Sequence, residues 1–432
     1  MPRRSHSRRS FLKQSSGLLL TVPAILAPGR SLFAGVSPNE RIHTAHIGVG
    51  SRGTNRMEKC VAHPEAEVVG VCDVDMEHLH RAHRQVWKQA RATADYRRLL
   101  DANDVDAVVI TTPDHHHAEM TIAACEAKKD VYCEKPLCTF LEEGRRMVTA
   151  VKEHKRVVQV GTHHRSHPTM REIVEIVRSG RIGRVHSVKC WMWTNPFKDA
   201  NAPTGVTPTH LDYQAWLGSA PFVPYHVDRI HFNFRWCRDY AGGYMTDWGA
   251  HMLNVVTHAM NVDYQGPVSV VASGGYKVGN LYDFPMSMRA TWEFKNPDFR
   301  LSWIQPEEGG DVASGQKYGM TFYGEAGELR TYFHGYEFVV DGKKAPVPTG
   351  GNGFRLPRVP RDHIQNWLDS IRSRQLPVAD IEAAHRTTSL CQLGNIALDS
   401  GRPLRWDGEH ERFIDDREAS RLLARDGVAV GD

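Results

Sequence analysis

The stretch RIHTAHIGVGSRG, residues 41–53, decides how the first half of this 432-residue chain folds. An apolar run ends in the glycines Gly48, Gly50 and Gly53, which predicts a β-strand, a glycine turn and a helix. Gly48 permits the tight turn, Gly50 lets the backbone approach a pyrophosphate, and Gly53 lets the helix pack on the strand. The N–H groups of the helix N-terminus would then face the phosphates of a dinucleotide.

Asp73 supports this interpretation, because it ends a second apolar strand 20 residues after Gly53. A carboxylate at that place accepts hydrogen bonds from a ribose diol and repels a 2′-phosphate, which favours NAD over NADP. The nearby cation Arg52 keeps NADP open as an alternative. A glycine turn without any ligand is the remaining alternative.

Strand and helix signals alternate through the first half of the chain. Apolar strands of a parallel sheet, covered by helices on both faces, are expected from this order. The strands are expected at 41–50, 66–75, 106–113, 130–136 and 157–164, and the helices at about 53, up to 92, 117–128 and 142–154. We therefore expect an NAD-binding α/β domain of the Rossmann type over residues 40–162.

The second half, residues 163–432, is expected to form an α+β substrate-binding domain. Its runs are rich in β-branched and aromatic residues with few helices between them, which predicts a large, mostly antiparallel open sheet. These runs lie at 189–195, 268–277, 286–294, 300–306, 317–324 and 328–333. Helices at 361–373 and 381–400 are expected to close this domain, and an open sheet face of this size predicts a homo-oligomer.

The N-terminal 34 residues are expected to be a cleaved export signal. The stretch SRRSFLK at 7–13 is followed by the apolar run GLLLTVPAILAP at 17–28 and the small-residue exit SLFAG at 31–35. The run is shorter than the roughly 20 residues of a membrane-spanning helix. Its paired arginines resemble the twin-arginine class, which carries folded proteins and predicts a periplasmic location. The alternative is a disordered basic tail.

Charge and cysteine content narrow the functional classes further. Removal of residues 1–34 leaves 48 basic and 50 acidic side chains, and no basic stripe suggests nucleic acid as a partner. No later apolar run is long enough to span a membrane. The eight cysteines include no C-x-x-C pair, which predicts buried free thiols.

Several motifs together resemble the glucose-fructose oxidoreductase and inositol dehydrogenase family. They are GVGSRG (48–53), TTPDHHHAE (111–119), CEKPL (133–137), RSGRIGRV (178–185) and GGYMTDWGAH (242–251). The resemblance implies oxidation or reduction of a hydroxyl or ketone on a sugar, glycoside or cyclitol. A minority of the family uses NAD transiently to cleave glycosides, so a redox-neutral glycosidase or lyase remains the alternative.

The resemblance also implies which residues hold the cofactor. They are Gly48, Gly50, Ser51, Arg52, Gly53, Asp73, Thr112, Pro113, Asp114, His117, Glu134 and Lys135. Asp114, His115 and His117 are expected along the cofactor and toward its nicotinamide side. An exported enzyme would have to retain this cofactor and regenerate it in place, by a second sugar, by returning the hydride to the same molecule, or by an external acceptor.

Lys135, Asp247 and His251 are the expected catalytic residues. Hydride leaves a carbinol carbon only as the hydroxyl proton leaves, so the reaction needs a base and a group that stabilises the oxyanion. Lys135 follows a parallel strand and precedes Pro136, and the family pattern places it on the reacting hydroxyl. Asp247 and His251 stand four apart, on one face if MTDWGAHMLNVV is a helix. A histidine suits proton transfer, so we expect His251 to be the base and Asp247 its partner.

Further substrate contacts are expected from His164 and Arg165, beside Lys135, Asp247 and His251. The family often has Asp where this chain has Asn254, which leaves finer substrate contacts in doubt. The aromatic residues Trp191, Trp193, Trp216, Phe232, Phe234 and Trp236 either stack on sugar faces or belong to the core. No metal is expected, because no H-E-x-x-H motif appears and adjacent histidines of a strand point to opposite faces.

Overall fold

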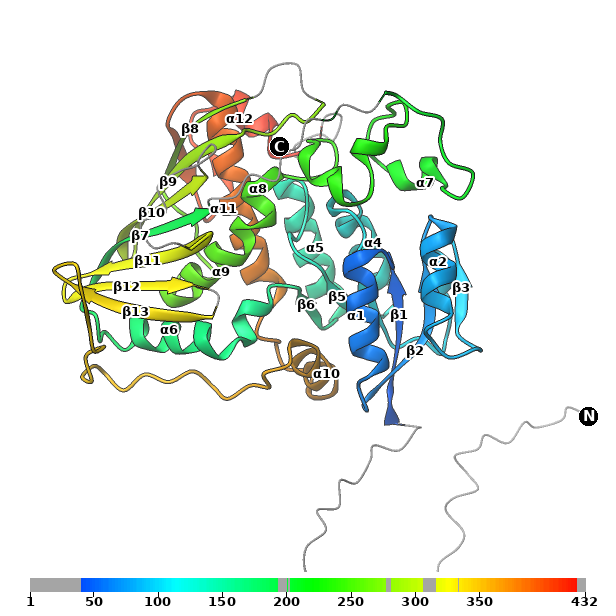
Figure 1. The fold of residues 1–432 in the computed structure, drawn as a ribbon, viewed down its shortest axis with the longest axis horizontal. Coiled ribbons are helices and arrows are strands. Elements are labelled where there is room, and N and C mark those ends of the chain that lie inside the picture. The colour runs from blue at the N-terminus through cyan, green and yellow to red at the C-terminus, as the bar shows by residue number, and fades with distance from the viewer. Residues whose placement is uncertain are drawn as a thin grey trace, which may run out of the picture.

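The computed structural model describes residues 40–192, 200, 203–276, 281–305, 316–332 and 334–425. Two sheets, each with its own helices, make up these residues (Figure 1). The expected export signal at 1–34 and Trp193 lie outside the described residues. None of the helices described is long and apolar enough to cross a membrane.

The first sheet has six strands, all parallel, in the order β3-β2-β1-β4-β5-β6. The strands are β1 (Ile42–Ile47), β2 (Ala66–Cys72), β3 (Arg91–Thr93), β4 (Ala107–Ile110), β5 (Asp130–Cys133) and β6 (Val158–Val160). The predicted Rossmann fold is confirmed, and the sequence pattern missed only β3, which is short and polar. Strand order reverses between β1 and β4, and such a switch point opens a ligand crevice at the carboxyl ends of the strands.

Helices cover both faces of this sheet. One face carries α1 (Ser51–Val61), α2 (Met76–His83) and α10 (His363–Ser373), and the other carries α3 (Arg97–Leu100), α4 (His117–Glu126), α5 (Leu141–His154) and the start of α11 (Ile381–Ser400). The expectation that α10 closes the second domain is wrong. Its buried residues Ile364, Trp367 and Leu368 share a hydrophobic core with Met57 and Cys60 of α1.

The second sheet has ten strands in the order β14-β13-β12-β11-β7-β10-β9-β8-β15-β16. They are β7 (Val185–Met192), β8 (Ser269–Gly275), β9 (Ser287–Lys295), β10 (Asp298–Gln305), β11 (Tyr318–Gly324), β12 (Gly327–Tyr332), β13 (Gly335–Val340), β14 (Lys343–Ala345), β15 (Leu404–Asp407) and β16 (Arg412–Phe413). Among the described pairs only β7 and β10 run parallel, so the predicted mostly antiparallel sheet is confirmed.

Strand register gives this sheet one apolar and one polar face. Leu301 of β10 lies between Trp292 of β9 and Val188 of β7, and Val188 pairs in turn with Phe322 of β11. All four are buried beneath α6 (Pro168–Arg178), α9 (Gly249–Ala259) and α11, which lie on one side of the sheet (Figure 1). The residues that follow them in each strand point to the opposite face and are polar, as Ser302 of β10 shows. An antiparallel sheet with one face packed on a core shows this alternation.

Residues 203–236, which we call the covering segment, connect the second sheet back to the first domain. The segment contains α7 (Tyr213–Leu217) and the 3₁₀ turns η5 (Val227–Arg229) and η6 (His231–Trp236). It is hydrogen-bonded to the loop after β2, since Met76 N–H donates to the His210 carbonyl at 2.8 Å and Asp212 N–H donates to the Val74 carbonyl at 3.0 Å. The covering segment therefore lies against the carboxyl end of β2.

The helix expected at MTDWGAHMLNVV is two helices. Asp247 ends α8 (Gly243–Asp247), Gly249 begins α9, and Trp248 lies between them. The last described helix is α12 (Arg417–Arg421). All eight cysteines are buried and none forms a disulfide, which confirms the predicted free thiols. The domain limits 40–162 and 163–432 stay a prediction.

Candidate active site

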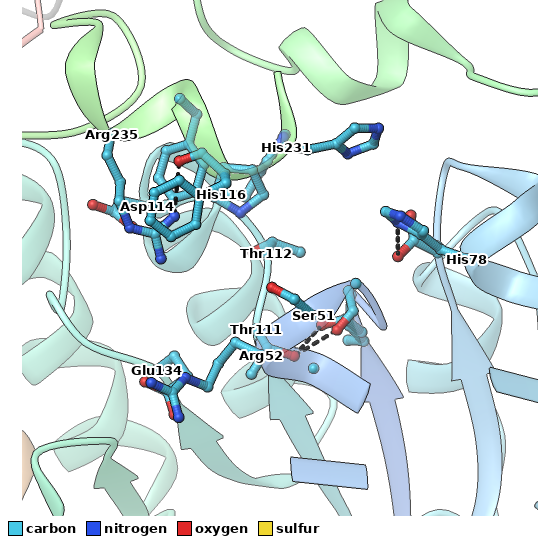
Figure 2. Close-up of a pocket in the computed structure, with 18 of the residues that line it drawn as sticks. Ser51, Arg52, His78, Thr111, Thr112, Asp114, His116, Glu134, His231 and Arg235 are labelled. Carbon is cyan, nitrogen blue, oxygen red and sulfur yellow. Dashed lines mark hydrogen bonds and ion pairs between the residues drawn. The ribbon is translucent and has the colours of Figure 1, made fainter. Parts of the chain in front are cut away.

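One cavity of about 510 Å³ lies at the carboxyl ends of the parallel strands (Figure 2). Its wall comes from the residues that follow five strands: Gly48–Gly53 after β1, Asp73–Asp75 after β2, Thr111–Asp114 after β4, Glu134 and Lys135 after β5, and His163 and His164 after β6. The covering segment, α8, α9 and β11 supply the opposite wall, including Asp247 and His251. The cavity thus joins the predicted cofactor residues to the predicted catalytic ones.

The glycine turn is shaped by close backbone contacts. Gly48 has a φ of +80°, and a Cβ there would meet the Thr112 nitrogen at 2.8 Å. A Cβ on Gly53 would lie 1.9 Å from the Gly48 carbonyl oxygen, so the helix packs against the turn only because residue 53 is glycine. A Cβ on Gly50 would meet no protein atom nearer than 3.5 Å. Packing therefore does not require Gly50, and its bare backbone keeps the cavity floor open for a pyrophosphate.

Asp73 joins the glycine turn to the end of β2. Its Oδ2 accepts the Val49 N–H at 2.8 Å and its Oδ1 accepts the Asp75 N–H at 2.9 Å. A carboxylate offers about four lone-pair sites, so acceptor capacity remains for a ribose diol. His78 Nδ1 lies 3.6 Å from Asp73 Oδ2, and this contact raises the pKa of His78 above its usual value.

Lys135 and Asp247 form a nearly buried ion pair. Lys135 Nζ donates to Asp247 Oδ1 at 2.6 Å and to the Asp247 main-chain oxygen at 2.7 Å. Arg235 Nε donates to the same carboxylate at 3.3 Å. Burial alone would raise the pKa of Asp247, but Lys135 and Arg235 outweigh it and lower that pKa to about 2. An ammonium group has three donors, so two bonds to Asp247 leave one N–H for a substrate oxygen.

His251 lies in a group of three histidine rings at the same end of the cavity. Its ring centroid is 5.0 Å from that of His163 and 4.8 Å from that of His164. Burial lowers the pKa of His251 well below its usual value, and the charge of Lys135 lowers it further. His251 is therefore a neutral imidazole that is able to accept a proton.

Two further carboxyl groups line the cavity and differ in their charge. Burial raises the pKa of Asp114 to about 8, although Arg235 and Lys135 oppose the rise. Burial would also raise the pKa of Glu134, but its bond with Arg56 at 2.7 Å and the charge of Arg52 lower it to about 2. Near neutral pH, Asp114 is therefore largely protonated while Glu134 is ionised.

Three predicted contacts, those of His115, His117 and Arg165, lie outside the cavity wall. Arg165 is buried and gives its donors to Asn254 Oδ1, to the carboxylate of Asp263 and to the Val378 carbonyl. Both ring nitrogens of His117 contact main-chain oxygens, those of Pro136 and Thr112. His117 therefore holds together two loops that line the cavity, and Arg165 braces α9. None of the three is a direct ligand contact in the proposed site.

Aromatic side chains divide between the cavity and the core. Trp216, Phe232 and Phe234 line the cavity, whereas Trp236 is fully buried among core residues and Trp191 belongs to the second sheet. The sequence analysis missed Trp248 and Tyr318, whose rings lie 4.8 Å apart in the cavity wall. It also missed His78, His116, His163, His231 and Arg235 as lining residues.

Two family models match the chain. One is described as an oxidoreductase family with an NAD-binding Rossmann fold and matches residues 42–162. The other is the C-terminal alpha/beta domain of the same family and matches residues 164–278 and 338–429. Together they match the first sheet, β7 and β8 of the second sheet and most residues of the cavity wall, but not residues 279–337, which contain β9, β10, β11 and β12.

Individual relatives match a smaller part of the chain. Inositol 2-dehydrogenase of Klebsiella pneumoniae is 34% identical over 146 residues, 33% of this chain and 43% of the relative. Levoglucosan dehydrogenase of Pseudarthrobacter phenanthrenivorans is 38% identical over 112 residues, 26% of this chain and 29% of the relative. This chain thus aligns with less than half the length of these curated relatives.

A solved structure of similar fold is the WlbA dehydrogenase from Bordetella pertussis in complex with NADH and UDP-GlcNAcA. The likeness has a TM-score of 0.63 at 19% identity and covers 85% of this chain and 99% of that one. At that identity the likeness shows the fold alone.

Proposed function

Because the chain belongs to the GFO/IDH/MocA oxidoreductase family, we propose that it uses NAD to oxidise or reduce a hydroxyl or ketone of a sugar, glycoside or cyclitol. The observation that carries the proposal is the meeting of Lys135, Asp247 and His251 in the cavity that begins at the glycine turn. The aligned relatives named as inositol and levoglucosan dehydrogenases support the substrate class.

The glycine turn, Asp73 and the loop after β4 together fit a dinucleotide. Ser51, Arg52 and Gly53 open α1 toward the cavity, where helix N–H groups would bind the pyrophosphate. Asp73 would accept hydrogen bonds from the adenosine ribose, and Thr112, Pro113 and Asp114 would line the path to the nicotinamide. NAD is favoured over NADP because the Arg52 side chain lies beside Glu134 (Figure 2) and its charge acts on Glu134 and His251.

The bound nicotinamide would accept or supply the hydride, and the side chains would manage the proton. During oxidation, the remaining N–H of Lys135 donates to the substrate oxygen and stabilises the negative charge that develops there. Neutral His251 accepts the hydroxyl proton as the C–H bond breaks and the C=O bond forms. Asp247 holds the Lys135 ammonium through two oxygens, and Arg235 keeps Asp247 ionised.

A second candidate function is redox-neutral cleavage of a glycoside or related elimination. Elimination after transient oxidation needs another acid or base near the adjacent carbon. The protonated carboxyl of Asp114 and the rings of His163 and His164 provide such groups in the same cavity. Product analysis separates the two functions: net oxidation changes the redox state of NAD, whereas released aglycone with unchanged NAD identifies cleavage.

Export of the folded protein through the twin-arginine pathway to the periplasm is part of the proposal. It is supported by Arg8 and Arg9 before the short apolar run. The covering segment supports retention of NAD during export, because its hydrogen bonds to residues 74 and 76 hold it beside the ribose carboxylate of Asp73. Assembly through the open sheet face is likewise proposed.

The deciding experiment starts with full-length protein recovered from the periplasm of an expressing cell. Denaturation should release NAD(H), identified by mass, and a screen of sugars and cyclitols against this holoprotein should change the nicotinamide absorbance. A matched Arg8→Lys/Arg9→Lys variant should stay in the cytoplasm, because the pathway recognises the arginine pair. A parent without bound dinucleotide that shows no activity when NAD is supplied would contradict the proposed function.

A further inference from the structure

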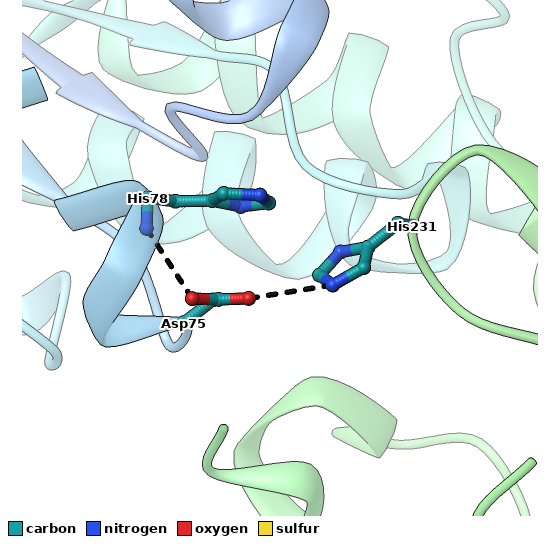
Figure 3. Close-up of side chains that lie close together, drawn as sticks. All are labelled: Asp75, His78 and His231. Atoms are coloured by element: carbon teal, nitrogen blue, oxygen red, sulfur yellow. Dashed lines mark hydrogen bonds and ion pairs between the residues drawn. The ribbon is translucent and has the colours of Figure 1, made fainter. Parts of the chain in front are cut away.

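We propose that Asp75, His78 and His231 bind a divalent first-row transition-metal ion, with Zn²⁺ as the reference ion, at the edge of the cofactor cavity (Figure 3). Among the described residues, these three form the group of histidine and acidic side chains whose possible ligand atoms all lie within 4.8 Å of one another. Imidazole and carboxylate ligands suit Zn²⁺, Cu²⁺ and Ni²⁺. The metal ion would take no part in hydride transfer.

Asp75 is held so that one carboxylate oxygen is left for a ligand. The side chain is buried, and its Oδ1 accepts the N–H groups of Glu77 at 2.8 Å and His78 at 3.3 Å, which caps helix α2. Its Oδ2 is the oxygen that approaches the histidines (Figure 3). The helix therefore orients Asp75 whether or not a metal is bound.

Distances around this oxygen approach those of a tetrahedral site. Asp75 Oδ2 lies 3.3 Å from His231 Nε2 and 3.9 Å from His210 Nε2. Ligands bound to Zn²⁺ at about 2.0–2.1 Å stand roughly 3.3 Å apart along a tetrahedral edge. The His210 and His231 side chains are 35% and 43% exposed, so both rings have room to rotate inward. His210 is thus the natural fourth ligand.

A second set of carboxylates lies behind two of the rings. His78 Nδ1 is 3.6 Å from Asp73 Oδ2, and His210 Nδ1 is 3.6 Å from Glu77 Oε1. Metal-binding histidines commonly give the N–H of one ring nitrogen to a carboxylate, which directs the other nitrogen to the metal. A carboxylate on Nδ1 of each ring would leave Nε2 for the ion. The carboxylates of Asp73 and Glu77 behind these rings favour a metal site over a chance cluster of polar residues.

The ligands come from both walls of the cavity. Asp75 and His78 follow β2, whereas His210 and His231 belong to the covering segment. One ion would therefore fasten the covering segment to the Rossmann domain, beside the place assigned to the adenosine ribose. The sequence predicted no metal because it lacks an H-E-x-x-H motif, and residues 75 and 231 lie too far apart in the chain to form such a motif. This proposal departs from that prediction.

Metal binding can be measured on the mature protein after treatment with a chelator. Calorimetric titration with Zn²⁺ and elemental analysis after gel filtration should give one ion per chain, and Co²⁺ should give the visible absorption of a tetrahedral site. His231→Ala and His78→Ala should each weaken binding at least tenfold. The control His410→Ala, which removes an exposed ring 2.8 Å from Asp407, should keep the parental affinity.

A folding control and a cofactor control complete the test. Circular dichroism should show that His231→Ala keeps the parental fold, and Zn²⁺ should raise the unfolding temperature of the parent but not of this variant. Titration with saturating NAD should give the same one-to-one stoichiometry. The proposal is wrong if the parent binds no stoichiometric ion, if folded His231→Ala binds as the parent does, or if NAD displaces the ion.

Discussion

Lys135 donates two hydrogen bonds to Asp247, one to the carboxylate at 2.6 Å and one to the main-chain oxygen at 2.7 Å. Lys135 follows β5 of the parallel sheet and Asp247 ends α8, so the pair connects the two walls of the cavity. Both side chains are nearly buried, at 8% and 14% exposure. The relative position of cofactor and substrate groups therefore depends on this pair.

Replacement of Lys135 by alanine should slow hydride transfer by roughly 100- to 1000-fold, which corresponds to about 2.7–4 kcal/mol for one oxyanion-stabilising donor. The NAD content should stay at the parental level, because the glycine turn and Asp73 are unchanged. Single-turnover absorbance of the nicotinamide measures the rate. Parental turnover by the folded variant would remove Lys135 from the proposed mechanism.

Lys135→Ala also leaves the Asp247 carboxylate buried with Arg235 as its remaining cation, and this unpaired charge is a second cause of slower hydride transfer. Removal of one partner of a buried ion pair typically costs about 3–5 kcal/mol of stability. The double variant Lys135→Ala/Asp247→Asn removes the unpaired charge, so it should recover thermal stability relative to Lys135→Ala. Its hydride transfer should stay slow. Recovery of the rate would show that Lys135→Ala is slow because of the unpaired Asp247 charge and not because it lacks the Lys135 donor.

The pH dependence of the rate should identify His251. The base must be neutral, so activity falls once pH drops through its pKa, which burial and Lys135 lower well below the usual value. The rising limb of the parental pH–rate profile should therefore lie on the acid side of about pH 6.5, the ordinary histidine pKa. Folded His251→Ala should lose this limb together with most activity, while the surface control His186→Ala should keep both. A limb unchanged in His251→Ala would assign it to another group.

The sequence predicted the fold well because both sheets leave direct patterns. Strands buried on both faces read as apolar runs at 66–75 and 106–113, and runs rich in β-branched and aromatic residues marked β9 and β10. The helix break at Trp248 left no such pattern, since apolar residues continue through it. Helix α10 was assigned to the wrong domain, because amphipathicity shows that a face is buried but not which sheet buries it.

Predictions of single site residues depended on partners distant in sequence. Asp247 was expected to be the partner of His251, but in the cavity its carboxylate pairs with Lys135 and Arg235. Arg165 follows β6 at a position typical of ligand contacts, yet Asn254 and Asp263 engage its guanidinium inside the protein. Charge and location relative to one strand did not reveal these partners, because both belong to the second domain.

The protonated state of Asp114 should appear in the pH dependence of stability. Its folded pKa of about 8 lies above the unfolded value of about 3.9, so the folded protein holds the extra proton between these limits. The contribution of Asp114 to stability should therefore be full below about pH 4, decline as pH rises, and level off above about pH 8. Asp114→Asn cannot ionise, so the stability of the parent relative to this variant should fall over that range.

Thermal unfolding of the parent and Asp114→Asn, at about pH 5 and about pH 9, measures this difference. The exposed replacement Asp341→Asn serves as the control and should follow the parent at both values. A difference between parent and Asp114→Asn that is independent of pH would mean that Asp114 is ionised throughout. Its role as an additional acid in the proposed cleavage reaction would then fail.

Asp73 should decide how firmly NAD is held and which dinucleotide is preferred. In Asp73→Ala the cofactor loses two ribose hydrogen bonds, each worth about 1.5–3 kcal/mol when made to a charged group. Val49 N–H also loses its acceptor, which loosens the glycine turn. Asp73→Asn keeps an oxygen for Val49 but removes the charge that repels a 2′-phosphate. NAD content after gel filtration should thus decrease from parent to Asp73→Asn to Asp73→Ala.

The same series distinguishes ribose recognition from a purely structural role of Asp73. If the carboxylate binds the ribose, the preference for NAD over NADP in equilibrium titrations should fall about tenfold or more in Asp73→Asn, because about 1.4 kcal/mol corresponds to a tenfold change in affinity. If Asp73 only supports the turn, both dinucleotides should weaken equally. The exposed Asp101→Asn variant is the control and should match the parent in NAD content and in preference. An unchanged preference in Asp73→Asn would remove Asp73 from the proposed ribose contacts.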